Sequence, residues 1–395
     1  MSEAWTQCVV GDVARQVKRA EPLEPDREYQ LLGVRWYAGG PFARETVTNE
    51  TSKATKLFRV EVGDFIYNRL FAWKGSFGVI APSLAGSYVS GEFPAFRTDP
   101  ASLLPEYLFL YMSRPGIWDQ ILLESTGSTA TSRNRWKEDR FLSMPIDLPP
   151  VQGQRRIVDL ISSIDAATVD GEAMLASTEM LLGASREEAW FSQVNSCLPL
   201  SEVATIEARM VDPTHDDYRD LFHVGVAQIE KDTGRLVEGK TAEEDGLISS
   251  KFLFTPEDII YSKIRPNLRK VALPRFTGLC SADAYPLRPK PGADPDFLRE
   301  MLLSEAFTRA AVAKSGRTKM PKVNRTELFS IDVPNPATEV QRANGEVFRA
   351  IRESREATGR VVEDLAALRG QLLDALISGE HEIPSSYDRF LKEAS

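Results

Sequence analysis

A repeat with a period of about 190 residues constrains the architecture of this chain more than any other feature of its sequence. The octapeptide at 62–69, VGDFIYNR, returns as PEDIIYSK at 256–263. Four further matches keep the same order: 32–34 with 224–226, 105–108 with 295–298, 146–149 with 331–334, and 154–155 with 341–342. Chance similarity would not stay collinear over five matches, so we expect two copies of one structural unit.

Each copy predicts a mixed block followed by a long helix. Short β-type runs at 64–70, 77–80 and 258–263 are separated by Gly and Pro, and short helices are expected at 105–113 and 295–304. Residues 151–191 and 337–378 lack proline, and helices of this length greatly exceed the average of about 11–12 residues. We therefore predict an α+β fold in which two mixed α/β domains alternate with two long helices that pair as an antiparallel coiled coil. The expected segments are 1–150, 151–195, 196–336, 337–380 and a C-terminal tail at 381–395.

Residues spaced by alternating steps of three and four predict the seam of the helix pair. The middle of the first helix is weak, because Gly171 and Thr178 occupy seam positions, and we interpret Gly171 as a point of close helix approach. The predicted seam residues are Ile157, Leu160, Ile164, Met174 and Leu181 in the first helix, and Val347, Ile351, Val361, Leu365, Leu368 and Leu372 in the second.

Composition excludes several classes of protein. Hydrophobic residues make up 42% and charged residues 27% of the 395, which is typical of globular domains and not of disordered or fibrous chains. No apolar run approaches the ~18 residues of a membrane span, and the first residues lack a basic start and an apolar core, so a cytoplasmic location with no membrane association is expected. Cys8, Cys197 and Cys280 are too far apart for a disulfide framework or a metal-binding pair.

The net charge of −9 is unevenly distributed along the chain. Residues 151–195 carry three basic and seven acidic groups, and 337–395 carry eight and eleven, whereas the two mixed blocks are near neutral. A near-neutral block can still present a basic face, so the acidity of the whole chain does not exclude binding to nucleic acid.

Common catalytic signatures are missing from the sequence. It contains no GxxxxGK[ST] phosphate loop, no HExxH and no GxSxG elbow, and Asn335-Pro336 is followed by Ala337 rather than by the residues of an amino-methyltransferase motif. His215, His223 and His381 are scattered. We expect a non-catalytic chain with no metal site and no cofactor of its own.

Several stretches, in their order, resemble type I restriction–modification specificity subunits. IDLPPVQGQRRI at 146–157 is similar to the stretch that opens the spacer helix in that family, and 333–342 is a looser second copy. Gly127-Ser128-Thr129 looks like the family's Gly-Ser-Thr turn, 315–322 is a variant of it, and LLDALISG at 372–379 resembles the close of the last helix. Gly153 replaces the usual Glu, and Asn344 interrupts the start of the second helix. The resemblance covers nearly the whole chain.

The resemblance implies the DNA-recognition subunit of a larger complex. Each mixed block would be a target-recognition domain that reads one half of a bipartite double-stranded DNA target, and the helices would hold two methyltransferase subunits, to which a restriction/translocase subunit is added. S-adenosylmethionine would bind the methyltransferase partner, and ATP and Mg the nuclease partner. Two alternatives stay open: a specificity subunit of a type II-like system with a fused nuclease–methyltransferase partner, and a non-DNA scaffold of two adhesion-like modules on a coiled rod.

Basic and hydroxyl-bearing clusters are the candidates for contact with DNA, because phosphates and base edges are bound by Arg, Lys, Asn and small hydroxyl donors. A solvated surface loop is the competing interpretation for each cluster, and Phe71 and Trp73, beside two of these residues, are equally typical of a core. The 263–270 cluster falls at the same place in the repeat as the one at 68–74. The candidates are Arg69, Lys74, Ser128, Thr129, Arg133, Asn134 and Arg135 in the first block, and Lys263, Arg265, Asn267, Arg269, Lys270, Arg317, Lys319 and Lys322 in the second.

Overall fold

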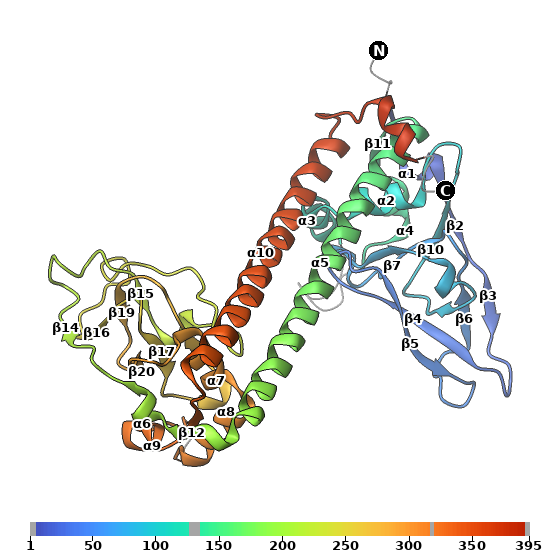
Figure 1. The fold of residues 1–395 in the computed structure, drawn as a ribbon. Coiled ribbons are helices and arrows are strands. Elements are labelled where there is room, and N and C mark those ends of the chain that lie inside the picture. Colours follow the sequence, from blue (N-terminus) through green and yellow to red (C-terminus); the bar gives the residue numbers. More distant parts are fainter. Residues whose placement is uncertain (1–4, 126–134, 317–319, 392–395) are drawn as a thin grey trace. The chain divides into compact units, whose positions relative to one another are not determined.

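The computed structural model describes residues 5–125, 135–316 and 320–391 (Figure 1). The chain divides into two compact units, unit 1 (residues 1–169 and 363–395) and unit 2 (residues 170–362). The unit boundaries cross the long helices α5 (Val151–Ser192) and α10 (Thr338–Ile377), whereas the sequence placed the domain boundaries at the helix ends. The reason is packing: each mixed block is buried against the first part of the helix that follows it and the last part of the other helix.

The described residues of unit 1 form three sheets and several short helices. A two-stranded sheet pairs β1 (Thr6–Val9) with β11 (Pro145–Leu148). The second sheet has the order β2 (Ala14–Val17), β10 (Ala95–Thr98), β7 (Phe65–Tyr67), β8 (Phe77–Val79). The third has the order β3 (Ala20–Pro22), β6 (Lys56–Arg59), β9 (Tyr88–Val89), β4 (Tyr29–Val34), β5 (Pro41–Val47). The helices are α1 (Val10–Val13), α2 (Pro105–Met112), α3 (Pro115–Glu124), α4 (Glu138–Leu142) and α11 (Asp388–Leu391).

The described residues of unit 2 repeat this topology, except that the third sheet has no counterpart of β5. A two-stranded sheet pairs β12 (Cys197–Pro199) with β21 (Asp332–Pro334). The second sheet has the order β13 (Ala204–Thr205), β20 (Ala284–Pro289), β17 (Ile259–Ser262), β18 (Val271–Ala272). The third has the order β14 (Met210–Val211), β16 (Lys251–Phe254), β19 (Gly278–Cys280), β15 (His223–Val224). The helices are α6 (Leu200–Val203), α7 (Pro295–Leu303), α8 (Glu305–Lys314) and α9 (Arg325–Phe329). The predicted duplication is therefore confirmed.

The repeated Asp of the octapeptide explains why this segment is so similar in the two copies. Asp64 is fully buried, accepts a hydrogen bond from the Glu61 backbone N–H at 2.8 Å and pairs with Arg97 of β10 at 2.7 Å. Asp258 accepts from the Thr255 N–H at 2.7 Å and pairs with Arg288 of β20 at 2.7 Å. A buried carboxylate needs such partners. In both copies it closes the turn before the central strand and fixes that strand to its neighbour.

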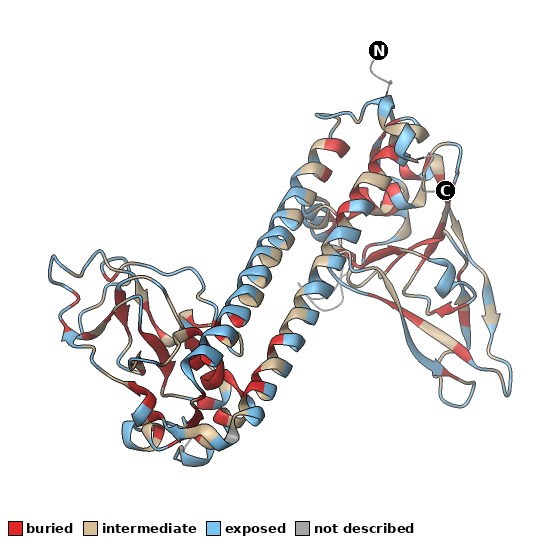
Figure 2. Cartoon of the chain, in the orientation of Figure 1, coloured by how far each residue is buried: buried red, intermediate tan, exposed pale blue. Residues whose placement is uncertain are grey.

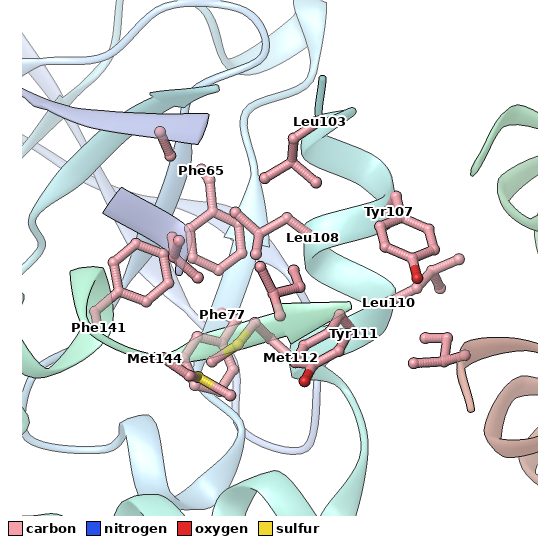
Figure 3. Close-up of a cluster of buried hydrophobic side chains, with 14 of the residues drawn as sticks. Phe65, Phe77, Leu103, Tyr107, Leu108, Leu110, Tyr111, Met112, Phe141 and Met144 are labelled. Carbon is pink, nitrogen blue, oxygen red and sulfur yellow. The ribbon is translucent and has the colours of Figure 1, made fainter. Parts of the chain in front are cut away.

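The core of unit 1 surrounds α2, which is buried on two faces (Figure 3). Leu108 and Met112 lie on the side of Phe65 and Phe77, whose rings come from β7 and β8. Tyr107, Leu110 and Tyr111 point away from that side of the helix. The same buried cluster includes Ile157 and Ile161 of α5 and Leu373, Leu376 and Ile377 of α10. α2 therefore joins the sheet of block one (residues 1–150) to the long helices.

A buried glutamine fixes the start of each long helix. Gln154 accepts a hydrogen bond from the Leu104 N–H at 2.9 Å and donates to the Ser102 and Pro149 carbonyls. Gln341 accepts from the Asp294 N–H at 3.1 Å and donates to Asn335 and to the Pro336 carbonyl. Leu104 and Asp294 are the N-caps of α2 and α7. The repeated Gln-Arg pair thus reflects a structural lock between the long helix and the block before it.

The long helices pair antiparallel within each unit. In unit 1, Arg369 of α10 donates to Asp165 of α5 at 3.1 Å. In unit 2, Arg355 lies 3.1 Å from Glu179, and a Cβ built on Gly171 would lie 2.6 Å from Cγ2 of Val362. In unit 2 the contacting residues run from 171 to 179 along α5 and from 362 to 355 along α10, so the two helices run in opposite directions. The close approach at Gly171 is the role the sequence assigned to it.

The predicted seam is wrong at alternate positions. Ile157 and Ile164 are buried, and Ile351, Leu365 and Leu372 are half-buried, but other positions are shifted by one residue, since Leu182 and Phe348 are buried where Leu181 and Val347 are exposed. Arg355 and Arg369 occupy inward positions with acidic partners, so the true stripe runs through Phe348, Val362 and Leu376. Leu160 is partly buried beside Ile161. The predicted residues that are instead exposed are Met174 (53%), Leu181 (55%), Val347 (55%), Val361 (56%) and Leu368 (49%). Figure 2 shows that the buried positions of both helices lie toward their ends, with intermediate and exposed positions between them.

Candidate nucleic-acid interface

Three loops converge in block one. The β4–β5 loop (residues 35–40) hydrogen-bonds the loop after β7 (residues 68–76), with Tyr37 N–H donating to the Lys74 carbonyl at 2.7 Å and Ala38 N–H to the Gly75 carbonyl at 2.8 Å. Residues 135–137 reach the same loop, because Trp136 N–H donates to the Arg69 carbonyl at 3.1 Å. All charged residues of the three loops are basic: Arg35, Arg69, Lys74, Arg135 and Lys137. Together they form loop cluster 1.

The corresponding loops converge in block two (residues 196–336). The loop after β17 (residues 263–270) is hydrogen-bonded to residues 320–323. Val323 N–H donates to the Lys263 carbonyl at 2.9 Å, and Arg265 N–H donates to the Pro321 carbonyl at 2.8 Å. Asp232 N–H, from the loop after β15, donates to the Leu268 carbonyl at 3.2 Å. Residues 225–235, 263–270 and 320–323 form loop cluster 2. The two basic clusters that the sequence aligned through the repeat therefore occupy equivalent places.

The predicted side chains of loop cluster 1 are held by neighbours. Arg69 pairs with Glu138, and Arg135 with Glu92 at 2.8 Å, a hydrogen bond that lowers the pKa of Glu92. The Lys74 Nζ lies 3.8 Å from the centroid of the Trp36 ring and 5.0 Å from that of Trp73. Such contacts fix the direction of a long side chain while leaving its charge beside the surface.

The predicted side chains of loop cluster 2 divide into two groups. Arg269, whose φ is +46°, pairs with Asp232 at 2.7 Å, while Lys270 donates to the Val226 carbonyl at 2.8 Å and Lys322 lies 3.3 Å from Asp283. Lys263 lies over the Tyr285 ring at 5.4 Å. Arg265 and Asn267 are exposed and make no side-chain hydrogen bond or ion pair with any described residue. Among the described candidates of this cluster, these two are free to bind an outside partner.

The sequence prediction missed two exposed aromatic residues of loop cluster 1, and six of the predicted positions lie outside the described residues. Trp36 and Tyr37 of loop cluster 1 are 42% and 68% exposed, and neither is among the predicted contact residues. The signal was available in the WYAGG pentapeptide between two β-type runs, where aromatic residues precede two glycines. The predicted positions outside the described residues are Ser128, Thr129, Arg133, Asn134, Arg317 and Lys319.

Within residues 5–125, 135–316 and 320–391, no group of three or more His, Cys, Asp or Glu side chains could hold a metal ion. Nor does any helix of these residues have the length and apolarity needed to cross a membrane.

Comparison with known proteins identifies the first part of the chain. Residues 3–175 match the family described as the type I restriction modification DNA specificity domain. The predicted resemblance is therefore confirmed for this part of the chain. The matched segment covers block one from residue 3, with loop cluster 1, and about the first half of α5.

Two kinds of relative extend the comparison. The specificity subunit of the type I restriction enzyme EcoDI from Escherichia coli is 37% identical over 158 residues, which are 40% of this chain and 34% of that subunit, so the match spans about a third of the relative. A type I restriction–modification S subunit from M. genitalium has the same fold, with a TM-score of 0.63, 12% identity and coverage of 95% of this chain and 96% of that one. A chain from a structure of the type I R-M system has a TM-score of 0.55, 17% identity and coverage of 94% and 97%.

Proposed function

We propose that this chain is the DNA specificity subunit of a type I restriction–modification complex, in which each block reads one half of a bipartite target. The observation that carries the proposal is the duplicated loop cluster. The same sheet order brings three loops together twice, with different side chains each time. Two such clusters are suited to recognising two different short sequences.

The comparisons support this function over the two alternatives. The matched family is named for DNA specificity, which disfavours a non-DNA scaffold. The family and the curated relative are both of type I, so a type II-like system with a fused partner is not favoured.

The partners follow from the same assignment. The helices would hold two methyltransferase subunits, and a restriction/translocase subunit would join the complex. S-adenosylmethionine would be bound by the methyltransferase, and ATP and Mg by the nuclease, because this sequence lacks their usual binding motifs. The chain itself would be non-catalytic, and the isolated chain is expected not to methylate DNA.

The test is sequencing of methylated genomes from cells that carry the chain with its methyltransferase partner. The wild type should give a motif of two short words separated by a fixed gap. Replacing residues 196–336 by the matching block of a relative should change one word only. Lengthening α5 should change the gap and keep both words. A continuous motif, or a swap that alters both words, would contradict independent reading by the two blocks.

A point variant sharpens this test in block two. Arg265→Ala removes an exposed, unpaired cation of loop cluster 2, and loss of a base contact should cost roughly 1–3 kcal/mol at one base position. Loss of a phosphate contact would instead weaken all sequences alike and lower the salt slope by about one unit. The matched control is Arg219→Ala in the same block, because Arg219 is also exposed but lies among Asp216, Asp220 and Glu243. The control should leave the motif unchanged.

A further inference from the structure

The tip of the β4–β5 loop has an unusual backbone. Tyr37 and Ala38 both have φ of +56°, a left-handed conformation that costs a residue with a Cβ of order 1 kcal/mol or more. The loop beneath is fixed as well, because Gly75 has φ of +70° and a Cβ there would lie 2.4 Å from the Trp118 ring. The two backbone hydrogen bonds to the Lys74 and Gly75 carbonyls hold the strained tip against this support.

This backbone exposes the ring of Tyr37 to solvent, while the neighbouring Trp36 is packed against other side chains. Trp36 is held by Lys74, whose Nζ lies over its ring, and by Phe71 at a ring distance of 5.2 Å. Tyr37, 68% exposed, is the most exposed aromatic residue in the described parts of the chain, and its ring centroid lies 6.1 Å from that of Trp118. Water contact over most of an aromatic ring is unfavourable, so a rigid ring presented in this way is typical of a binding surface.

The surroundings of the ring indicate the chemistry of the partner. The charged groups within loop cluster 1 are all basic, and the carboxylates that pair with Arg69 and Arg135 come from outside the three loops. A projecting aromatic ring among cations fits a polyanion that also offers apolar surface. Duplex DNA meets both requirements, with phosphates along the strands and base edges, including the thymine methyl, in the groove.

We propose that Tyr37 is a sequence-reading residue of block one, whose ring contacts a base pair in the half-site that this block recognises. Lys74, whose Nζ lies over the Trp36 ring, and Arg35, whose guanidinium lies 4.5 Å from the centroid of the Phe42 ring, would contact phosphates near this base pair. The strained, doubly hydrogen-bonded backbone holds the ring in place before DNA arrives, which lowers the ordering cost of binding. The inference rests on the proposed function and adds a residue that neither the sequence argument nor the comparisons indicated.

The experiment compares three variants in the complex with the methyltransferase partner. Tyr37→Ala should relax one base position of one half-site in the methylated motif, and should lower the ratio of specific to non-specific DNA affinity roughly tenfold to a hundredfold. Tyr37→Phe keeps the ring and should keep the motif. Phe390→Ala is the matched control, because Phe390 is a 51% exposed aromatic on α11, outside the loop cluster. It should behave as the wild type.

The outcomes separate this proposal from the function on which it rests. If the wild type methylates a bipartite motif and Tyr37→Ala leaves both the motif and the affinity ratio unchanged, Tyr37 does not read DNA, while the specificity function stands. If the wild-type complex methylates no bipartite motif, the proposed function itself fails. Should Tyr37→Ala abolish methylation, specific binding lost with non-specific binding retained would support the reading role. Equal loss of both kinds of binding would overturn it in favour of a structural role.

Discussion

The helices α2 of unit 1 and α7 of unit 2 occupy equivalent positions in the repeated fold. At one of these positions α2 makes apolar contacts with the long helices, whereas α7 makes ion pairs with them. Each short helix lies between the sheet of its block and the long helices. In unit 1 the buried positions include Leu110 of α2 and Leu373 of α10. The segments 105–108 and 295–298 are 190 residues apart, so Leu110 of α2 corresponds to Glu300 of α7. Gln154 and Gln341 are 187 residues apart, so Arg186 of α5 corresponds to Leu373 of α10. Two buried leucines of one unit are therefore replaced by an ion pair in the other.

The ionic version in unit 2 extends into a network. Glu300, which is fully buried, accepts from Arg186 at 2.7 Å and from Arg352 at 2.7 Å, and it also pairs with Arg299. The neighbouring Asp296 is also fully buried. Its Oδ2 forms ion pairs with Nη2 of Arg349 at 2.9 Å and with Nη2 of Arg275 at 2.5 Å. Burial lowers the pKa of Arg299 to about 10. Burial alone would raise the pKa of Glu300, but the charges of Arg299, Arg186 and Arg352 outweigh it and lower that pKa.

The two units therefore share the same fold, but the interactions that stabilise it at this position differ: they are apolar in unit 1 and ionic in unit 2. Apolar contacts tolerate substitution by residues of similar volume and depend little on pH. A buried ion pair contributes little net stability, yet removing one partner is costly because the other charge remains buried. Unit 2 should therefore be the more vulnerable of the two to single substitutions at this place. Four predictions test the comparison.

The largest effect is expected for Glu300→Ala. Three arginines would lose their buried carboxylate, at a cost of about 3–5 kcal/mol. Amide hydrogen exchange read by mass spectrometry should show protection lost in α7 and in residues 338–362, with α2 unchanged. The matched variant Leu110→Ala should destabilise unit 1 by about 2–5 kcal/mol and leave α7 protected. Loss of protection in both units with either variant would show that the two places are not independent.

The next effect concerns the one contact that both units share. Gln154→Ala and Gln341→Ala each remove three hydrogen bonds of a buried amide and leave the N-cap N–H of α2 or α7 without its acceptor. An unpaired buried donor costs about 1–3 kcal/mol. Urea unfolding should show losses of similar size for the two variants. A loss in only one of them would indicate that the repeated glutamines have diverged in role.

Acid should weaken unit 2 through Glu300. Its pKa in the folded protein lies below the ordinary value of 4.5, so its stabilising contribution is complete above about pH 4.5 and is lost as the pH falls through the lowered folded-state pKa. Hydrogen exchange of α7, measured as a function of pH and corrected for the intrinsic rate, should report this loss. Glu300→Gln should reduce the pH dependence, and an unchanged acid profile in that variant would assign the effect to other carboxylates.

The smallest effect is expected where the predicted and observed seams differ. Leu368→Asp should change the free energy of unfolding by less than about 0.5 kcal/mol, because Leu368 is 49% exposed. Val347→Ala should be equally mild, whereas Phe348→Ala, one residue on, should cost about 3–5 kcal/mol because Phe348 is 2% exposed. Thermal unfolding of the three variants suffices. A severe effect of Leu368→Asp would restore the seam that the sequence predicted.

The sequence by itself determined the duplication, the α+β class, the two long helices and the place of the basic clusters. Each of these depends on local patterns: collinear matches, proline-free length, and Gly or Pro between short β-type runs. Short helices were predicted at 105–113 and 295–304, and α2 and α7 lie there. The resemblance to specificity subunits arose from motifs in a fixed order, which is also a property of the linear chain.

Only the tertiary structure decided which side chains face which partners. Arg355 and Arg369 read as surface residues in a sequence, because the cost of burying a charge is offset only by a carboxylate from a distant segment. Glu300 and Asp296 are hidden for the same reason. Loop cluster 1 is likewise assembled from segments up to a hundred residues apart, so the strained tip that raises Tyr37 depends on Lys74 and Gly75 beneath it. Local patterns carry no information about partners that only folding brings together.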